Sequence, residues 1–189
     1  MPTEKNHLGM WQLISEDYIA NGRDWTKPGF RALAVYRFGV WRMGIRFDLV
    51  RKIASIVYRI GYRRCRNVYG IELPYSAQLG RRIVIEHQGG IVIHGATLIG
   101  DDTIIRQGCT FGIRKLDRLN DAPAVGKNVN IGAGAVIIGP VNIGDGASIG
   151  ANSVVLDDVP AGGLAVGVPA RLVTRGKTGK ENRDRAPKG

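Results

Sequence analysis

The chain has 189 residues and a formal net charge of +11, from 27 lysines and arginines against 16 aspartates and glutamates. This length allows one core with a small accessory element. The two cysteines cannot build a disulfide framework, which favours a reducing compartment. No apolar run reaches the ~18 residues of a membrane span, and the charged amino-terminal residues include no apolar run of signal-peptide length. We therefore expect a cytoplasmic protein that does not span a membrane.

The first part of the chain has the pattern of helices. Residues 11–20 suggest a short helix, which the following Asn-Gly pair terminates. A second helix is expected to start near Pro28, since proline is favoured in a first turn. A third is expected over residues 47–66, where apolar residues recur at helical spacing. We expect these helices to form a cap made of residues 1–70.

The expected cap is strongly basic. Between Pro28 and Tyr69 the only acidic residue is Asp48, and aromatic residues lie among the many arginines. Two interpretations remain open. The cap either packs its aromatics on the rest of the chain and leaves its arginines in water, or it also contacts an anionic membrane surface. No nucleic-acid recognition motif accompanies the basic residues, so a nucleic-acid partner is not expected.

After the cap, the sequence repeats itself with a period of six residues. A large apolar residue holds the first position of each repeat: Leu79, Ile85, Ile93, Ile99, Ile105, Phe111, Val125, Ile131, Ile137, Ile143, Ile149 and Val155. This period fits neither an amphipathic helix nor an alternating strand, but it suits a short strand and a corner repeated around a solenoid. We expect these side chains to point inward, within a domain of residues 71–173.

Two interruptions break the repeat, and they are where chemistry should be sought. Two extra residues precede Ile93, and a longer loop, residues 112–124, follows Phe111. The first interruption, IEHQGG, contains His87 followed by glycines that let another group approach closely. His87 is therefore the candidate functional base. Beyond the repeats, residues 174–189 contain no large aliphatic residue and are expected to be disordered.

An ordered series of motifs runs through the repeat region: GIELPYSAQLGRR, IEHQGGIVI, GDDTIIRQGCTFG, VGKNVNIGAGAVIIGPVNIG, IGANSVVLDDVP and GVPAR. This series, over residues 70–173, resembles the serine acetyltransferases and their polysaccharide-modifying relatives. The resemblance implies a mostly β fold, a left-handed parallel β-helix of hexapeptide repeats, which is an exception to the usual right-handed crossover. It also implies an acyltransferase. A β-helix assembly module without activity is the distant alternative.

The resemblance also assigns catalytic roles. The family's general base matches His87, and the carboxylate that orients it matches Glu72, where the family usually has aspartate. A neutral imidazole can take a proton from an alcohol at cellular pH, and a carboxylate on its other nitrogen fixes the tautomer. The alcohol would then attack the thioester directly, without an acyl-enzyme intermediate.

The donor implied by the resemblance is acetyl-CoA, held in a slot between neighbouring subunits, with no metal expected. Ala133 and Ala151 match small positions against which the pantetheine arm lies. Arg171 and Lys127 are candidates to meet the CoA phosphates. Gly112 matches a glycine at the reaction centre, and its amide is a candidate donor to the developing oxyanion.

One departure from the family concerns the acceptor. The family loop carries an Arg-His pair that grips the carboxylate of serine, and the matching residues here are Asp121 and Ala122. Asp121 would repel such a carboxylate, and the helical part is shorter than in the housekeeping enzymes. We therefore expect the acceptor to be a sugar hydroxyl of an exopolysaccharide or its lipid-linked precursor, with Glu86 and Asp121 accepting hydrogen bonds from it. The alternative is serine O-acetylation in cysteine biosynthesis.

Assembly and location follow from the same reasoning. The open solenoid faces and the implied intersubunit slot predict a homotrimer, with pairing of two trimers through the caps as a further expectation. Membrane contact would place the enzyme at the inner face of the cytoplasmic membrane. A zinc-dependent γ-type carbonic anhydrase would need three histidines, whereas this coil has His87 and His94. We interpret His94 as a structural residue at a surface or interface.

Overall fold

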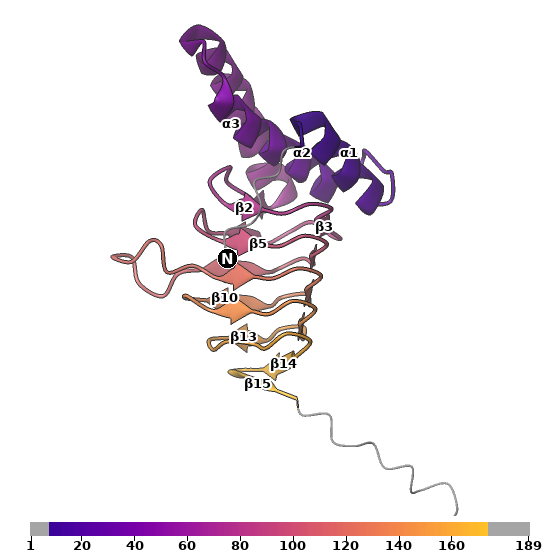
Figure 1. Cartoon of the computed structure of the whole chain (residues 1–189), viewed down its shortest axis with the longest axis vertical. Coiled ribbons are helices and arrows are strands. Elements are labelled where there is room, and N and C mark those ends of the chain that lie inside the picture. Colours follow the sequence, from indigo (N-terminus) through magenta and orange to yellow (C-terminus); the bar gives the residue numbers. More distant parts are fainter. Residues whose placement is uncertain (1–7, 174–189) are drawn as a thin grey trace, which may run out of the picture.

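A computed structural model of the chain describes residues 8–173, and Figure 1 shows helices at one end of a stack of short strands. The predicted tail, residues 174–189, lies outside this range. The helices are α1 (Met10–Ala20), α2 (Pro28–Trp41) and α3 (Asp48–Tyr69), with a 3-10 turn, η1 (Arg42–Gly44), after α2. All three predicted helices are thus confirmed. Proline begins α2 as expected, and Gly70 ends α3 in a left-handed conformation with φ of 65°.

Short strands make up the rest of the described chain. They are β1 (Ile71–Glu72), β2 (Gln78–Leu79), β3 (Val84–Ile85), β4 (Ile91–Ile93), β5 (Leu98–Ile99), β6 (Ile104–Ile105), β7 (Thr110–Gly112), β8 (Ala124–Val125), β9 (Asn130–Ile131), β10 (Val136–Ile138), β11 (Asn142–Ile143), β12 (Ser148–Ile149), β13 (Val154–Val155), β14 (Leu164–Gly167) and β15 (Ala170–Leu172).

The strands form three sheets that are the three faces of a β-helix. Their orders are β1-β4-β7-β10-β13, β11-β8-β5-β2 and β15-β14-β12-β9-β6-β3. Consecutive strands therefore lie on different faces, and each strand pairs in parallel with the strand one turn further on. The final pair, β14 and β15, is antiparallel and closes the far end. The predicted left-handed parallel β-helix is confirmed.

The interior of the β-helix is a set of stacked aliphatic columns. In one of them Ile93 pairs with Phe111, Phe111 with Ile137, and Ile137 with Val155. All twelve side chains predicted to point inward are buried, and burial of each contributes roughly 1.5–3 kcal/mol. The coil begins one repeat earlier than predicted, because Leu73 is also buried, six residues before Leu79.

Side chains of α1 and α2 cap the open backbone edge of the first turn. Ile83 N–H donates to Asp17 Oδ1 (3.1 Å), and Asn21 Nδ2 donates to the Ile83 carbonyl (2.9 Å). Tyr36 accepts from Leu79 N–H (3.0 Å), and Arg37 Nη1 donates to the Leu79 carbonyl (3.2 Å). Backbone groups that would otherwise lack partners are thereby satisfied.

Two arginines of the cap are buried, whereas the cap interpretation left its arginines in water. Arg37 Nε lies 2.8 Å from Asp17 Oδ2, and the two side chains are 4% and 0% exposed. Burial raises the pKa of Asp17, and the Arg37 hydrogen bond opposes that rise. The Arg42 guanidinium carbon lies 4.4 and 4.3 Å from the ring centroids of Tyr58 and Tyr75. That part of the interpretation was wrong, because the arginines supply donors and aromatic contacts inside the cap.

We predict that Arg37→Leu lowers the free energy of unfolding by about 3–5 kcal/mol, because it leaves the Asp17 carboxylate buried without its cation. Urea denaturation followed by circular dichroism measures the change. Arg51→Leu is the matched control, since Arg51 forms an exposed ion pair with Asp48 at 2.5 Å and such pairs contribute little. Equal losses for the two variants would contradict the capping role of the buried pair.

Candidate active site

His87 lies at one corner of the β-helix, where the chain passes from β3 to β4. Its side chain is exposed, and the backbone turns at Gly89 and Gly90 with φ of 100° and 66°. A Cβ on Gly90 would lie 3.3 Å from the Gly108 Cα of the next turn. Glycine at this corner therefore lets the bulge that presents His87 stack closely on the turn beneath it.

The predicted orienting carboxylate, Glu72, is half-buried on β1. Its Oε1 accepts a hydrogen bond from the Tyr62 hydroxyl of α3 (3.2 Å). Burial, together with the negative charge of Glu72, raises the pKa of Tyr62 to about 12, so the phenol stays a neutral donor. Among the hydrogen bonds of residues 8–173, none joins Glu72 to His87. Sequence reasoning missed Tyr62, because only the packing of α3 on β1 brings it to Glu72.

Glu86, the predicted acceptor-binding carboxylate, has a partner from the next turn. Arg106 Nε lies 2.7 Å from Glu86 Oε2. The pairing follows from register, because Ile85 stacks on Ile105 and the residues that follow them are therefore neighbours. Sequence reasoning also missed Arg106, although its position one residue after a repeat position is a usable signal.

Several predicted site residues share the corner of His87. Ala133 lies between β9 and β10, and Ala151 lies between β12 and β13, so the chain makes the same passage between sheets at each. Asn152 N–H donates to the Ala133 carbonyl (2.8 Å), which stacks these two turns directly. We call this corner the His87 edge, and it consists of residues 86–90, Gly108, Ala133 and Ala151.

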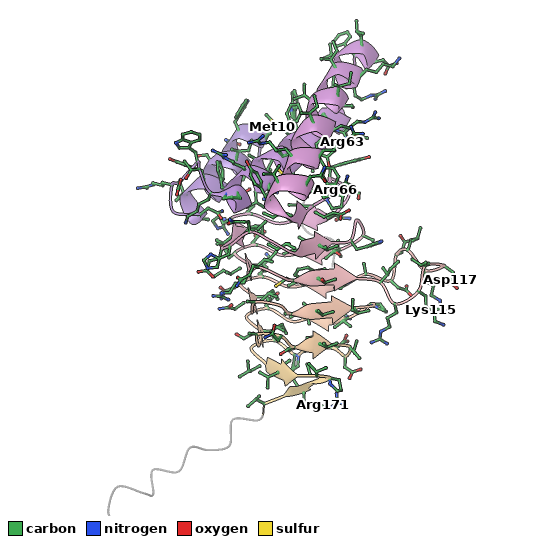
Figure 2. The ribbon with its side chains drawn as sticks, turned by 180° about the vertical axis from the view of Figure 1, so that it is seen from behind. Met10, Arg63, Arg66, Lys115, Asp117 and Arg171 are labelled. Atoms are coloured by element: carbon green, nitrogen blue, oxygen red, sulfur yellow. The ribbon has the colours of Figure 1, made fainter. Side chains whose placement is uncertain are left out.

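The other two predicted CoA contacts lie elsewhere. Lys127 follows β8, at the corner that leads to β9, and its side chain is exposed. Arg171 lies on β15, at the end of the β-helix remote from the helices (Figure 2), with Nη1 3.7 Å from Asp157 Oδ2. It borders a cavity of about 340 Å³ that Val155 and Ala165 also line. Within one chain, neither cation belongs to the His87 edge.

The long loop of the second interruption projects from another corner, between β7 and β8. Figure 2 shows its labelled residues, Lys115 and Asp117, standing away from the β-helix. Gly112, at the end of β7, is half-buried where the loop begins. The loop leaves the corner between β7 and β8, whereas His87 lies at the corner between β3 and β4, so the two occupy different corners of one chain.

Arginines hold the loop internally and against the coil. Arg114 donates through Nε to the Ile138 carbonyl (3.3 Å) and through Nη2 to the Leu156 carbonyl. Arg118 Nη1 lies 3.8 Å from Asp121 Oδ2. Both side chains are exposed to solvent, so this pair compensates the charge of Asp121 only weakly.

His94 is half-buried, and its Nδ1 accepts a hydrogen bond from Ala96 N–H (3.3 Å). This contact is compatible with the structural role predicted for it. Within the described part of the chain, no group of three or more histidines, cysteines and carboxylates is arranged to hold a metal ion. Nor does any helix of residues 8–173 have the length and apolarity needed to cross a bilayer.

Comparison with known proteins agrees with this geometry. Residues 123–157 match the family model described as bacterial transferase hexapeptide (six repeats). The chain is 36% identical to serine acetyltransferase of Synechococcus elongatus, over 78% of this chain and 58% of that protein. It is 37% identical to serine acetyltransferase of Helicobacter pylori strain J99, over 78% of this chain and 82% of that protein.

A solved structure has the same fold. Serine acetyltransferase from Brucella abortus, in complex with coenzyme A, superposes with a TM-score of 0.73 and 26% sequence identity, covering 86% of this chain and 67% of that one. The fold and the repeats define a hexapeptide-repeat acyltransferase, as predicted. The chain belongs to the serine acetyltransferase-like family of these proteins.

The prediction that the acceptor is a sugar hydroxyl of an exopolysaccharide or its lipid-linked precursor is wrong. The relatives at 36% and 37% identity are named serine acetyltransferases, which favours the alternative. The prediction depended on repulsion by a single loop residue, Asp121, which has the cation of Arg118 as a neighbour at 3.8 Å. It also depended on a short helical part, yet this chain covers 82% of the Helicobacter pylori enzyme.

We predict that Arg114→Ala makes the loop more susceptible to proteolysis, because it removes the hydrogen bonds to the Ile138 and Leu156 carbonyls. Limited chymotrypsin digestion with mass spectrometry should show faster cleavage after Leu116 or Leu119. Arg118→Ala is the control, since it leaves both anchoring bonds in place. Unchanged cleavage rates in Arg114→Ala would show that these bonds do not hold the loop.

Proposed function

We propose that this chain is an acetyl-CoA-dependent serine O-acetyltransferase. The observation that carries the proposal is the exposed His87 on its bulge, at the same edge as Ala133 and Ala151, in a chain related to enzymes of that name. A general base beside small residues suits transfer of an acyl group to an alcohol.

In the proposed reaction His87 takes the proton of the serine hydroxyl as the hydroxyl oxygen attacks the thioester carbonyl. The C–S bond then breaks, and the imidazolium returns the proton to the departing CoA thiolate. Glu72 orients His87 as the acceptor complex forms, and Tyr62 holds the carboxylate through its neutral hydroxyl. The amide of Gly112 donates to the developing oxyanion.

Both substrates are proposed to bind at the His87 edge, acetyl-CoA along its small residues and serine beside Glu86. In a slot between neighbouring copies, the pantetheine arm of acetyl-CoA lies along Ala133 and Ala151, and Arg171 and Lys127 meet the phosphates. The Brucella abortus structure, solved with coenzyme A, supports a CoA site on this fold. Glu86 faces the serine ammonium group, and its pairing with Arg106 at 2.7 Å fixes its position.

The active form is proposed to be a homotrimer in the cytoplasm. The loop with Gly112 and Asp121 and the edge with His87 lie at different corners of one chain, so a neighbouring copy supplies the loop. Two trimers pair through the helical caps. The basic helices of the cap are further proposed to contact an anionic membrane surface, since α3 has a single acidic residue, Asp48.

We predict that His87→Ala lowers kcat by about 10² to 10⁴, the usual weight of a general base. His94→Ala is the matched control, because the His94 side chain accepts a local hydrogen bond from the Ala96 amide, and the turnover of this variant should stay within a few-fold of the wild type. The measurement is CoA thiol release from acetyl-CoA and L-serine. Near-normal turnover by His87→Ala would show that His87 is not the general base.

We also predict that the wild-type enzyme turns over L-serine with kcat/KM of ~10⁴ M⁻¹s⁻¹ or above. The double variant Asp121→Arg/Ala122→His restores the pair of the family and should lower KM for L-serine, because it adds a cation where the carboxylate binds. L-Threonine and glycine serve as comparison acceptors. Absence of serine-dependent CoA release from folded trimers would contradict the proposed acceptor.

A further inference from the structure

Helix α3 carries an exposed apolar surface that no other part of the described chain covers. We call it the apolar stripe, and it consists of Leu49, Val50, Ile53, Ile56, Val57 and Ile60, which are 50–72% exposed. The residues of α3 that face the protein are others: Ala54, Tyr58 and Cys65. The apolar periodicity that predicts this helix therefore marks its solvent face.

The stripe is continuous along one side of the helix. Leu49, Ile53, Ile56 and Ile60 are spaced by four, three and four residues, so they fall on a single face about 16 Å long. Figure 1 shows α3 projecting beyond the β-helix, away from its strands. An exposed apolar patch of this kind marks an interaction surface.

The charges around the stripe are positive. Lys52, Arg59 and Arg63 follow one side of it at helical spacing, and all three are exposed. The only acid of α3, Asp48, is paired with Arg51 at 2.5 Å. A second copy packed on the stripe would bring such basic rows together with no carboxylate in α3 to offset them. The complementary partner is anionic.

The end of α2 and the connection to α3 also carry exposed aromatic and apolar residues. Trp41, Met43 and Phe47 are 47%, 50% and 76% exposed, and they precede the stripe in the chain. Arg46 lies between them. Large apolar side chains beside basic ones are typical of helices that lie in the interface of an anionic membrane.

We propose that α3 lies in the interface of an anionic lipid bilayer, with the apolar stripe at the boundary of headgroups and acyl chains. Lys52, Arg59 and Arg63 meet the lipid phosphates, Phe47 enters at the amino-terminal end of the helix, and Trp41 adds a second aromatic anchor. This inference rests on the membrane contact proposed above and names the surface that makes it. It is independent of which acceptor the enzyme uses.

The test is cosedimentation of the full chain with vesicles of phosphatidylglycerol and phosphatidylcholine in equal parts, and with vesicles of phosphatidylcholine alone. Ile53→Asp places a carboxylate in the centre of the stripe and should weaken binding to the anionic vesicles by about tenfold or more. Ile19→Asp is the matched control, because Ile19 on α1 is 54% exposed and Ile53 is 56% exposed. It adds the same charge outside the stripe and should bind like the wild type.

A second readout reports insertion. In a Trp11→Phe/Trp25→Phe background, brominated acyl chains should quench the fluorescence of Trp41.

Equal binding by Ile53→Asp and Ile19→Asp, with binding abolished by salt, would contradict insertion of the apolar stripe and leave a purely electrostatic contact. No binding of the wild type to anionic vesicles at low salt would contradict both the insertion of the stripe and the electrostatic contact of the cap with a membrane. A smaller mass of Ile53→Asp by light scattering without vesicles would show that a second copy covers the stripe. CoA release measured without vesicles reports on the proposed enzymatic function separately.

Discussion

The structure depends on the hydrogen bonds that α1 and α2 make to the open backbone edge of the first turn. A β-helix pairs each turn with the next, so its first turn exposes donors and acceptors along one side. Asp17, Asn21 and Tyr36 satisfy these groups with side chains, and Arg37 joins them while it pairs with Asp17. The cap is therefore a structural requirement of the coil, and its position in turn places α3 over β1.

That placement links the cap to the candidate site. Because α3 packs on β1, Tyr62 reaches Glu72, and because β1 pairs with β4, the segment that follows the His87 bulge runs beneath them. The bulge itself depends on Gly89 and Gly90, which turn the chain at the corner. Strand register thus brings His87, Ala133 and Ala151 to one corner, although they are far apart in the sequence.

The exposed face of α3 follows from the same arrangement. The helix contacts the protein through Ala54, Tyr58 and Cys65, which are spaced along one side. With that side occupied, the larger aliphatic residues are left on the outside. In an isolated helix the larger apolar face would be taken as the core face, so the assignment of faces needed the neighbouring elements.

The sequence by itself determined the coil, its inward residues and the helices, because a period of six residues and helical spacing are local properties of the chain. It also placed His87 at an interruption. Only the tertiary structure decided that Tyr62 donates to Glu72, that Arg106 pairs with Glu86, and that the loop and His87 occupy different corners. These relations join residues from different turns or elements, so they depend on how the turns stack and how α3 packs on the first of them. The acceptor was predicted wrongly because a single charged residue, Asp121, was given more weight than the motif series shared with the serine acetyltransferases.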